Sequence, residues 1–310
     1  MVFDILMILG GLVLLVLAGD ALVKGAVNLS LRLGVPALIV GLTVVAFGTS
    51  APELLVSVQA TLDHAPALAL GNVVGSNIAN ILVVLGVPAL ITAVPVSREL
   101  MHDFLVMMAA TLLFVVMAYL GPMTWPHGLV LLAGLAAMLW NSYTRARDHR
   151  ASETVELEGV EDGISGLRIA LYLAGGLIGL PLGANLLVEG AVNVATALGV
   201  SEAVIGLTLV AIGTSLPELA TTTAAAIRRQ AGVAMGNVIG SNIFNLLGII
   251  GVTTLVGPLP VPQSMLHFDI WVMVATALLL GGFVLTGRSI GKTVGAGLIA
   301  LYVLYLLWLF

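Results

Sequence analysis

The stretch "FGTSAPELLVS", residues 47–57, places a glutamate, three hydroxyl side chains, a glycine and a proline inside a strongly apolar run. Proline has no N–H, and within a helix it frees the carbonyl four residues earlier, here that of Gly48. Glycine itself also weakens a helix. We therefore predict an interrupted helix whose main-chain oxygens turn toward a cavity that contains Glu53.

The composition around this stretch is that of a polytopic membrane protein. The 310 residues are 60% hydrophobic and 9% charged, whereas soluble domains are about 45–50% apolar and about 25% charged. A membrane β-barrel would alternate polar and apolar residues, and runs such as "LLFVVMAYL" do not. Because a spanning helix needs roughly 20 apolar residues, we predict ten helices, near 3–22, 36–61, 66–92, 103–121, 126–142, 166–187, 201–227, 232–256, 268–286 and 290–310.

The basic residues favour one orientation of these ten spans. Positive side chains accumulate on the cytoplasmic side of a membrane. With the N-terminus and C-terminus outside, every basic residue falls on the inside, and the opposite orientation places all of them outside. The chain is therefore predicted to be integral to a membrane, with a prokaryotic plasma membrane favoured by its short loops. The eleven basic residues are Lys24, Arg32, Arg98, Arg145, Arg147, Arg150, Arg168, Arg228, Arg229, Arg288 and Lys292.

The chain consists of two copies of one pattern, related by adding 165 to the residue number. "GLTVVAFGTSAPEL" at 41–54 returns as "GLTLVAIGTSLPEL" at 206–219 with 11 of 14 residues identical, and "GNVVGSNIAN" at 71–80 returns as "GNVIGSNIFN" at 236–245 with 8 of 10. Since each copy holds five spans, an odd number, the copies enter the membrane in opposite directions. Inverted repeats of this kind are typical of secondary transporters, with the substrate site at the midplane between them.

We therefore divide the chain into a first repeat (1–142), a linker (143–165) and a second repeat (166–310). The linker is the most polar stretch, basic in its first part and acidic in its second. A mixed-charge segment of this length is predicted to be a solvated cytoplasmic loop. It is too short for a regulatory domain of ordinary size.

The repeat brings two intramembrane acids, Glu53 and Glu218, into equivalent positions. Such residues usually face a cavity with a function. Each follows a G-T-S-x-P run, so carbonyls near Ala46 and Thr49, and near Ala211 and Thr214, are expected to turn inward. The next span of each half adds a hydroxyl and an amide four residues apart, on one helix face. These are Ser76 with Asn80 and Ser241 with Asn245.

The resulting donor set consists of oxygens alone. Carboxylate, carbonyl, hydroxyl and amide oxygens suit a hard cation, and calcium takes about 6–8 oxygen ligands. The chain has no cysteine, and softer metals would call for Cys or His. Two ionised glutamates are neutralised by one Ca²⁺ or two Na⁺. An empty, doubly negative site would move through low dielectric at considerable cost, which is a physical reason for obligatory exchange.

These paired motifs resemble the two α-repeats of the sodium/calcium exchanger branch of the cation/calcium antiporters, and the resemblance covers essentially the whole chain. It implies that Thr49, Glu53, Thr214 and Glu218 bind calcium, the threonines through their carbonyls. Sodium sites would use Ala46, Ser50 and Ser241 beside Thr49 and Glu53, and Ala211, Ser215 and Ser76 beside Thr214 and Glu218. Asn80 and Asn245 would line the centre.

The resemblance also carries a mechanism and one departure. In the family the first and sixth spans slide across the core, so segments 20–33 and 185–198 would belong to the sliding pair. Some relatives have Asp where this chain has Asn245, and the amide makes potassium dependence less expected. The short linker implies no calcium-sensor domain.

The leading interpretation is a secondary active Na⁺/Ca²⁺ antiporter, and an H⁺/Ca²⁺ or other divalent-cation antiporter on the same scaffold is the alternative. An intramembrane hydrolase would need a base beside Ser50 or Ser215, and no histidine falls in the middle of a span. We expect no enzyme activity, no cofactor, no nucleic-acid partner and no obligate protein partner. The expected partners are Ca²⁺, Na⁺ and the lipid bilayer.

Overall fold

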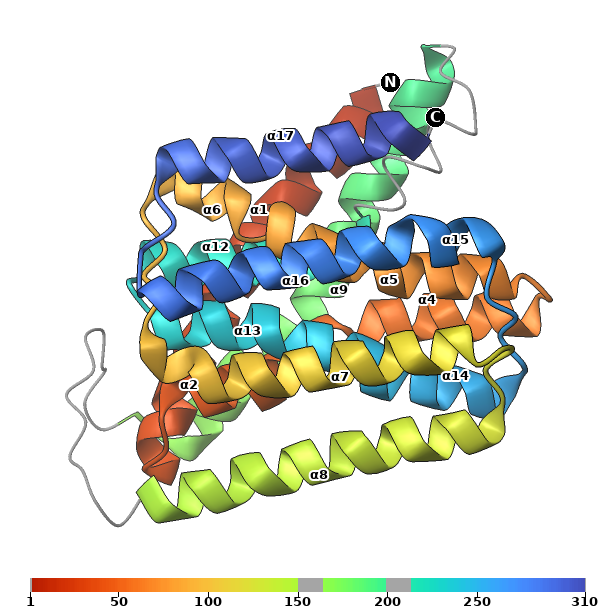
Figure 1. The fold of residues 1–310 in the computed structure, drawn as a ribbon. Coiled ribbons are helices and arrows are strands. Elements are labelled where there is room, and N and C mark those ends of the chain that lie inside the picture. The colour runs from red at the N-terminus through yellow and green to blue at the C-terminus, as the bar shows by residue number, and fades with distance from the viewer. Residues whose placement is uncertain (1, 150–163, 199–212, 310) are drawn as a thin grey trace.

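The computed structural model describes residues 2–149, 164–198 and 213–309. In this part of the chain every regular element is a helix, apart from two isolated backbone bridges. Figure 1 shows a bundle of roughly parallel helices with α8 along one edge and α17 along the opposite edge. The all-helical membrane fold predicted from the sequence is therefore confirmed.

The described helices nearly account for the expected spans. Seven are long and apolar enough to cross a membrane, or eight when the bent pair 37–49 and 51–62 is counted as one span. Helix α8 adds 25 residues, which also exceeds the roughly 20 needed. The expected span 201–227 is described only from Gly213. The count of ten is consistent with these helices, and it stays a prediction.

The first half contains four long helices and a chain of short ones. The elements are α1 (Val2–Leu33), α2 (Ala37–Val40), the π-helix η1 (Gly41–Val45), α3 (Ala46–Thr49), α4 (Ala51–Leu62), α5 (Pro66–Leu82), α6 (Gly86–Ile91), the 3₁₀-helix η2 (Arg98–Leu100), α7 (Met101–Tyr119) and α8 (Trp125–His149).

The second half repeats this order over its described residues. The elements are α9 (Gly166–Ala197), α12 (Leu216–Ile227), α13 (Ala231–Ile243), the π-helix η4 (Phe244–Ile249), α14 (Ile250–Val256), α15 (Gln263–His267), α16 (Asp269–Thr286) and α17 (Lys292–Leu309).

Helices α1 and α9 are longer than the apolar stretches 3–22 and 166–187 that predict them, with 32 residues each. In α1 the apolar run ends at Asp20 and Lys24, but these two side chains form an i,i+4 ion pair of 3.3 Å on one helix face. Such pairs support a helix, so a charged turn does not end it. Helix α8 likewise continues to His149, beyond the expected end at 142.

The two long helices pack against each other in antiparallel directions through glycines. A Cβ on Gly11 would lie 2.6 Å from the nitrogen of Leu187, and one on Gly176 would lie 2.5 Å from the Cβ of Leu22. Residues near the start of α1 contact residues near the end of α9, and residues further along α1 contact residues nearer the start of α9. Small residues allow this close approach of helices within a membrane.

The helix that carries segment 47–57 is interrupted as predicted, and the interruption lies at Ser50, two residues after Gly48. Helix α3 ends at Thr49 and α4 begins at Ala51, with Ser50 between them at φ −84° and ψ 6°. The axes of 37–49 and 51–62 differ by 42°. Pro52 lies in the first turn of α4, where its missing N–H does no harm. The proline therefore starts a new helix at the bend.

The inverted repeat is visible in the backbone as well as in the sequence. His64 and Arg229, which are related by the offset of 165, both follow a helix with positive φ, 59° and 55°. Two antiparallel bridges, Val94 with Ile290 and Met123 with Leu259, join loops of opposite halves. The two halves therefore share local geometry that their hydrophobicity alone does not require.

Candidate cation site

Both glutamates occupy the first turn of a helix that begins at a bend. Ser50 is the N-cap of α4, which carries Glu53, and Ser215 is the N-cap of α12, which carries Glu218. The positive end of a helix dipole stabilises an anion. The side chains are 1% and 0% exposed. In the described part of the chain neither forms an ion pair with a basic residue.

The sequence-predicted residues of the two halves meet across the repeat boundary. Ser50 donates a hydrogen bond of 2.9 Å to Oε1 of Glu218, and Ser241 donates one of 3.4 Å to the same atom. The carboxylates of Glu53 and Glu218 lie close enough to interact electrostatically. The site is thus one shared site and not two separate ones.

Two asparagines that the sequence analysis did not select hold this arrangement together. Asn72 donates to the carbonyl of Glu53 (3.2 Å) and to Ser57 Oγ (3.0 Å), and its oxygen accepts from Thr214 (3.4 Å). Its equivalent, Asn237, lies in the same relation to the second half. It donates to the carbonyl of Glu218 (3.3 Å) and to Thr222 (3.0 Å), and accepts from Thr49 (3.0 Å).

A cluster of buried polar atoms without hydrogen-bond partners coincides with the predicted site. Nine such side-chain atoms occur in the described residues, and all but Asp103 Oδ2 belong to residues selected from the sequence. Buried polar groups are normally paired, so the oxygens among these are atoms that a cation could satisfy. Within the selected residues the oxygens are both carboxylate oxygens of Glu53, Oε2 of Glu218, the hydroxyls of Ser76 and Ser215, and Oδ1 of Asn80 and Asn245, whereas Nδ2 of Asn245 is a donor that a cation cannot satisfy.

The remaining residues selected from the sequence differ in whether their oxygens are open to a cation. The carbonyl of Ala46 already accepts from the N–H of Ser50 (3.0 Å). The hydroxyl of Thr49 lies 3.3 Å from the same oxygen, but its single proton has the shorter contact with Asn237 (3.0 Å), so one lone pair of the carbonyl is still open to a cation. Thr214 is half-buried. Ala211 lies outside the described residues, so its expected role stays a prediction.

The two central asparagines, Asn80 and Asn245, also differ in their hydrogen bonds. Asn80 donates to Oδ1 of Asn242 (3.1 Å), and Nδ2 of Asn242 donates to the sulfur of Met107 (3.8 Å). Asn245 lies in the π-helix η4 with both amide atoms unpartnered. Because π-helical turns often occur at functional sites, the register of η4 supports the placement of Asn245 in the site.

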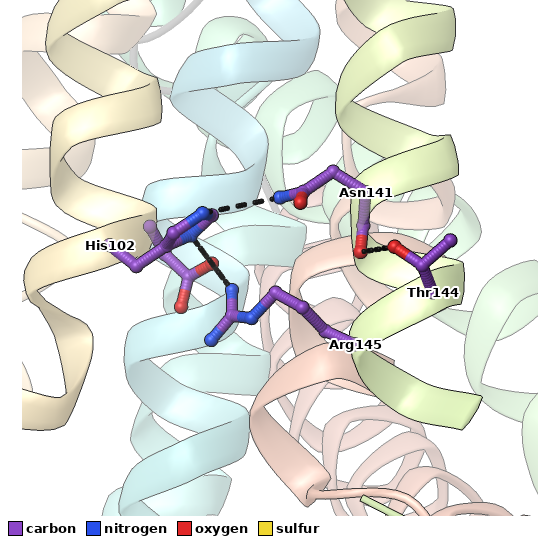
Figure 2. Close-up of polar contacts among 5 residues, drawn as sticks. His102, Asn141, Thr144 and Arg145 are labelled. Atoms are coloured by element: carbon purple, nitrogen blue, oxygen red, sulfur yellow. Dashed lines mark hydrogen bonds and ion pairs between the residues drawn. The ribbon is translucent and has the colours of Figure 1, made fainter. Parts of the chain in front are cut away.

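A second polar cluster, between α7 and α8, has a different character. Asp103, 4% exposed, pairs with Arg145 at 2.5 Å, and Arg145 also contacts Nδ1 of His102 at 2.9 Å. Figure 2 shows His102 facing Asn141 and Arg145, which project from α8. The guanidinium already neutralises the carboxylate, so this cluster ties α8 to α7 and does not suit a cation. His102 thus contributes to the packing of α7 against α8.

Asn237→Ala is expected to lower the rate of Ca²⁺ uptake into proteoliposomes at least about tenfold. Residues that orient the ligands of a metal typically matter by about 10–100-fold, and Asn237 contacts both Glu218 and Thr49. The matched control is Asn77→Ala, because Asn77 bonds only to its own helix, at the carbonyl of Val73 (2.8 Å). Equal losses in the two variants would contradict an orienting role for Asn237.

The helical fold with two inverted repeats, and the buried oxygens that meet between them, are those expected of a membrane transporter. A family model described as sodium/calcium exchanger protein matches residues 3–144 and 168–310. The sodium/calcium exchanger MaX1 of Methanosarcina acetivorans is 34% identical, covering 99% of this chain and 98% of its own. An uncharacterized membrane protein of Methanocaldococcus jannaschii is 38% identical, covering 95% and 94%.

Solved structures of a sodium-calcium exchanger also match this chain. The sodium-calcium exchanger NCX_Mj, soaked with 2.5 mM Na⁺ and 1 mM Sr²⁺, is 36% identical with a TM-score of 0.84, covering 98% of both chains. The chain belongs to the sodium/calcium exchanger family. The resemblance stated from the two motifs is therefore confirmed. Because this is a family of exchangers, the comparisons give no support to an intramembrane hydrolase.

Proposed function

We propose that this protein is a Na⁺/Ca²⁺ antiporter that works by alternating access, with Glu53 and Glu218 binding the cations at the centre of the membrane. The observation that carries the proposal is the cluster of unpartnered buried oxygens on these two glutamates and on Ser76, Ser215 and Asn80. Unpaired buried carboxylates are costly, and a cation removes that cost.

Calcium and sodium would use overlapping parts of this cluster. Calcium takes about 6–8 oxygens, including carboxylates, so both glutamates and the carbonyls of Thr49 and Thr214 would serve it. The hydroxyls of Ser50, Ser241, Ser76 and Ser215 supply further neutral oxygens, which a sodium ion uses and a proton does not need. Competition for the same two carboxylates couples the movement of the two ions.

Charge also explains why exchange would be obligatory. Either one Ca²⁺ or two Na⁺ neutralises two ionised glutamates, while the site without cations keeps a charge of about −2. Moving that charge past apolar helices is unfavourable. The loaded states are therefore the ones expected to change access, which prevents a leak.

We infer that α1 and α9 form the sliding pair. They contact each other along a glycine-lined seam, and α1 packs on α12 where a Cβ on Gly19 would lie 3.0 Å from the carbonyl of Ala220. Flat seams of small residues permit translation with little change in packing. The basic residues orient the chain with both termini outside, and prokaryotic relatives favour a plasma membrane.

Transport by the purified protein tests this proposal. Proteoliposomes are loaded with Na⁺ and diluted into Na⁺-free buffer with Ca²⁺, with the pH clamped equal on both sides. We expect Ca²⁺ uptake that depends on the Na⁺ gradient and stops when K⁺ replaces internal Na⁺. Uptake that ignores Na⁺ and follows an imposed pH gradient would overturn the sodium proposal in favour of H⁺/Ca²⁺ antiport.

A further inference from the structure

An ion pair joins the proposed sliding helix α1 to the core helix α12. Asp20 on α1 accepts hydrogen bonds from Nε and an Nη of Arg228, the C-cap residue of α12. The two side chains are each about one-third exposed, 37% and 32%. Just beside them Ala225 is fully buried, in one cluster with Leu22 and Ala26 of α1.

Lys24 extends this contact to α9. Its ammonium group lies 3.3 Å from Asp20 Oδ2 and 5.8 Å from the centre of the Tyr172 ring on α9. Cations placed over aromatic rings are attracted to them. Asp20 is thus held from two sides, by Lys24 within the α1–α9 pair and by Arg228 from the core.

The inverted repeat shows that the positions equivalent to Asp20 and Arg228 cannot form the same ion pair on the other membrane face. Adding 165 to Asp20 gives Asn185, and subtracting 165 from Arg228 gives Asp63. On the other face the same two positions therefore hold a neutral amide and an acid, which cannot form an ion pair. Asp63 instead accepts from Gln59 of its own helix at 2.9 Å.

We propose that Asp20 and Arg228 form a one-sided latch that keeps the face of the protein bearing Arg228 closed and so sets which way the cation site opens. The alternation between faces rests on the proposed function, whereas the closure of this face rests on the contacts themselves. Any slide of α1 and α9 along α12 must separate the pair. Because the equivalent positions on the opposite face hold Asn185 and Asp63, which do not pair, the resting population is biased toward opening there.

Thiol accessibility tests the latch without any transport measurement. The chain has no cysteine, so Ala225→Cys introduces the only thiol, at a buried position beneath the pair. The rate of its modification by a membrane-impermeant thiol reagent is measured on membranes of both sidedness, without Ca²⁺. An exposed ion pair is worth about 0.2–1 kcal/mol, so Asp20→Asn and Arg228→Gln should each raise the rate from the Arg228 face up to about fivefold.

Three further variants separate a latch from simple loosening. The double variant Asp20→Asn/Arg228→Gln should react no faster than either single one, because the two residues act through each other. Arg228→Lys keeps the charge and should retain most of the protection. Asp63→Asn, at the equivalent position of the other face, should leave the rate unchanged.

In the transport assay the latch has a signature that damage does not. A shift between two access states changes the apparent Ca²⁺ affinity in opposite directions on the two faces, so Asp20→Asn should weaken binding from the opposite face and strengthen it from the Arg228 face. Unchanged thiol rates in both single variants would overturn the latch, as would an equal rise in Asp63→Asn. If the thiol rates change and no Na⁺-dependent uptake is found, the proposed function fails and the latch stands.

Discussion

Ca²⁺ uptake is expected to fall about 100-fold or more in Glu53→Gln and, independently, in Glu218→Gln. Removing one partner from a buried charge pair typically costs about 3–5 kcal/mol, and each 1.4 kcal/mol is a factor of about ten. Both carboxylate oxygens of Glu53 are buried without a protein partner. The measurement is initial Ca²⁺ uptake by Na⁺-loaded proteoliposomes, with Asp63→Asn as an exposed acid that should keep normal transport.

Thermal stability separates loss of binding from loss of fold in these variants. Without Ca²⁺, Glu53→Gln removes an unpaired buried charge, so its Tm should equal or exceed that of the unchanged protein. Added Ca²⁺ should raise the Tm of the unchanged protein and leave both variants unaffected, because a ligand stabilises only a protein that binds it. Near-normal uptake in either variant would contradict the placement of the site.

The two glutamates are not equivalent in the structure, although the sequence makes them so. Ser50 bonds to Glu218 at 2.9 Å, whereas the equivalent pair, Ser215 and Glu53, lies close together without a hydrogen bond of ordinary geometry. An inverted repeat with perfect symmetry would give both glutamates the same contacts. Such a difference is what the proposed alternating access requires, since that mechanism exchanges the environments of the two halves.

The sequence predicted the features that depend on residue identity at repeated positions. Glu53 and Glu218 stood out because a carboxylate in an apolar span is rare, and the break before them followed from the chemistry of Pro52. Asn72 and Asn237 did not stand out, since most of their motif is repeated and identity alone does not show which amide bonds to which helix. The length of α1 was missed because hydropathy counts Asp20 and Lys24 as charges and does not show that they pair.

Packing beside the site is tighter at Gly240 than any pattern in the sequence reveals. A Cβ on Gly240 would lie 2.6 Å from the carbonyl oxygen of Leu42 and 2.6 Å from the Cβ of Ala46. Its repeat equivalent is Gly75, but the residues equivalent to Leu42 and Ala46, at 207 and 211, lie outside the described residues. Gly240 therefore leaves no room for a side chain between α13 and η1.

Gly240→Ala is expected to be the most damaging change of a single methyl group. The backbone of η1 cannot yield as a flexible side chain would, so α13 must move away, at a cost of about 1–3 kcal/mol in the free energy of unfolding. Ser241, the next residue, bonds to Glu218 at 3.4 Å, so the shift reaches the site directly. A misplacement of about 1 Å can cost a geometry-dependent site roughly 100-fold, and we expect Ca²⁺ uptake to fall by about that factor.

Gly282→Ala is the control, because it adds the same methyl group to an exposed glycine of α16 that has no neighbouring heavy atom of the described residues within 4 Å. Its Tm should stay within about 1–2 °C of the unchanged protein, while that of Gly240→Ala should fall by several degrees, since about 1 kcal/mol shifts Tm by about 2–4 °C in proteins of about 150–250 residues. If the two variants lose transport and stability equally, the contact between α13 and η1 does not hold Ser241 in place, and other elements must position the site.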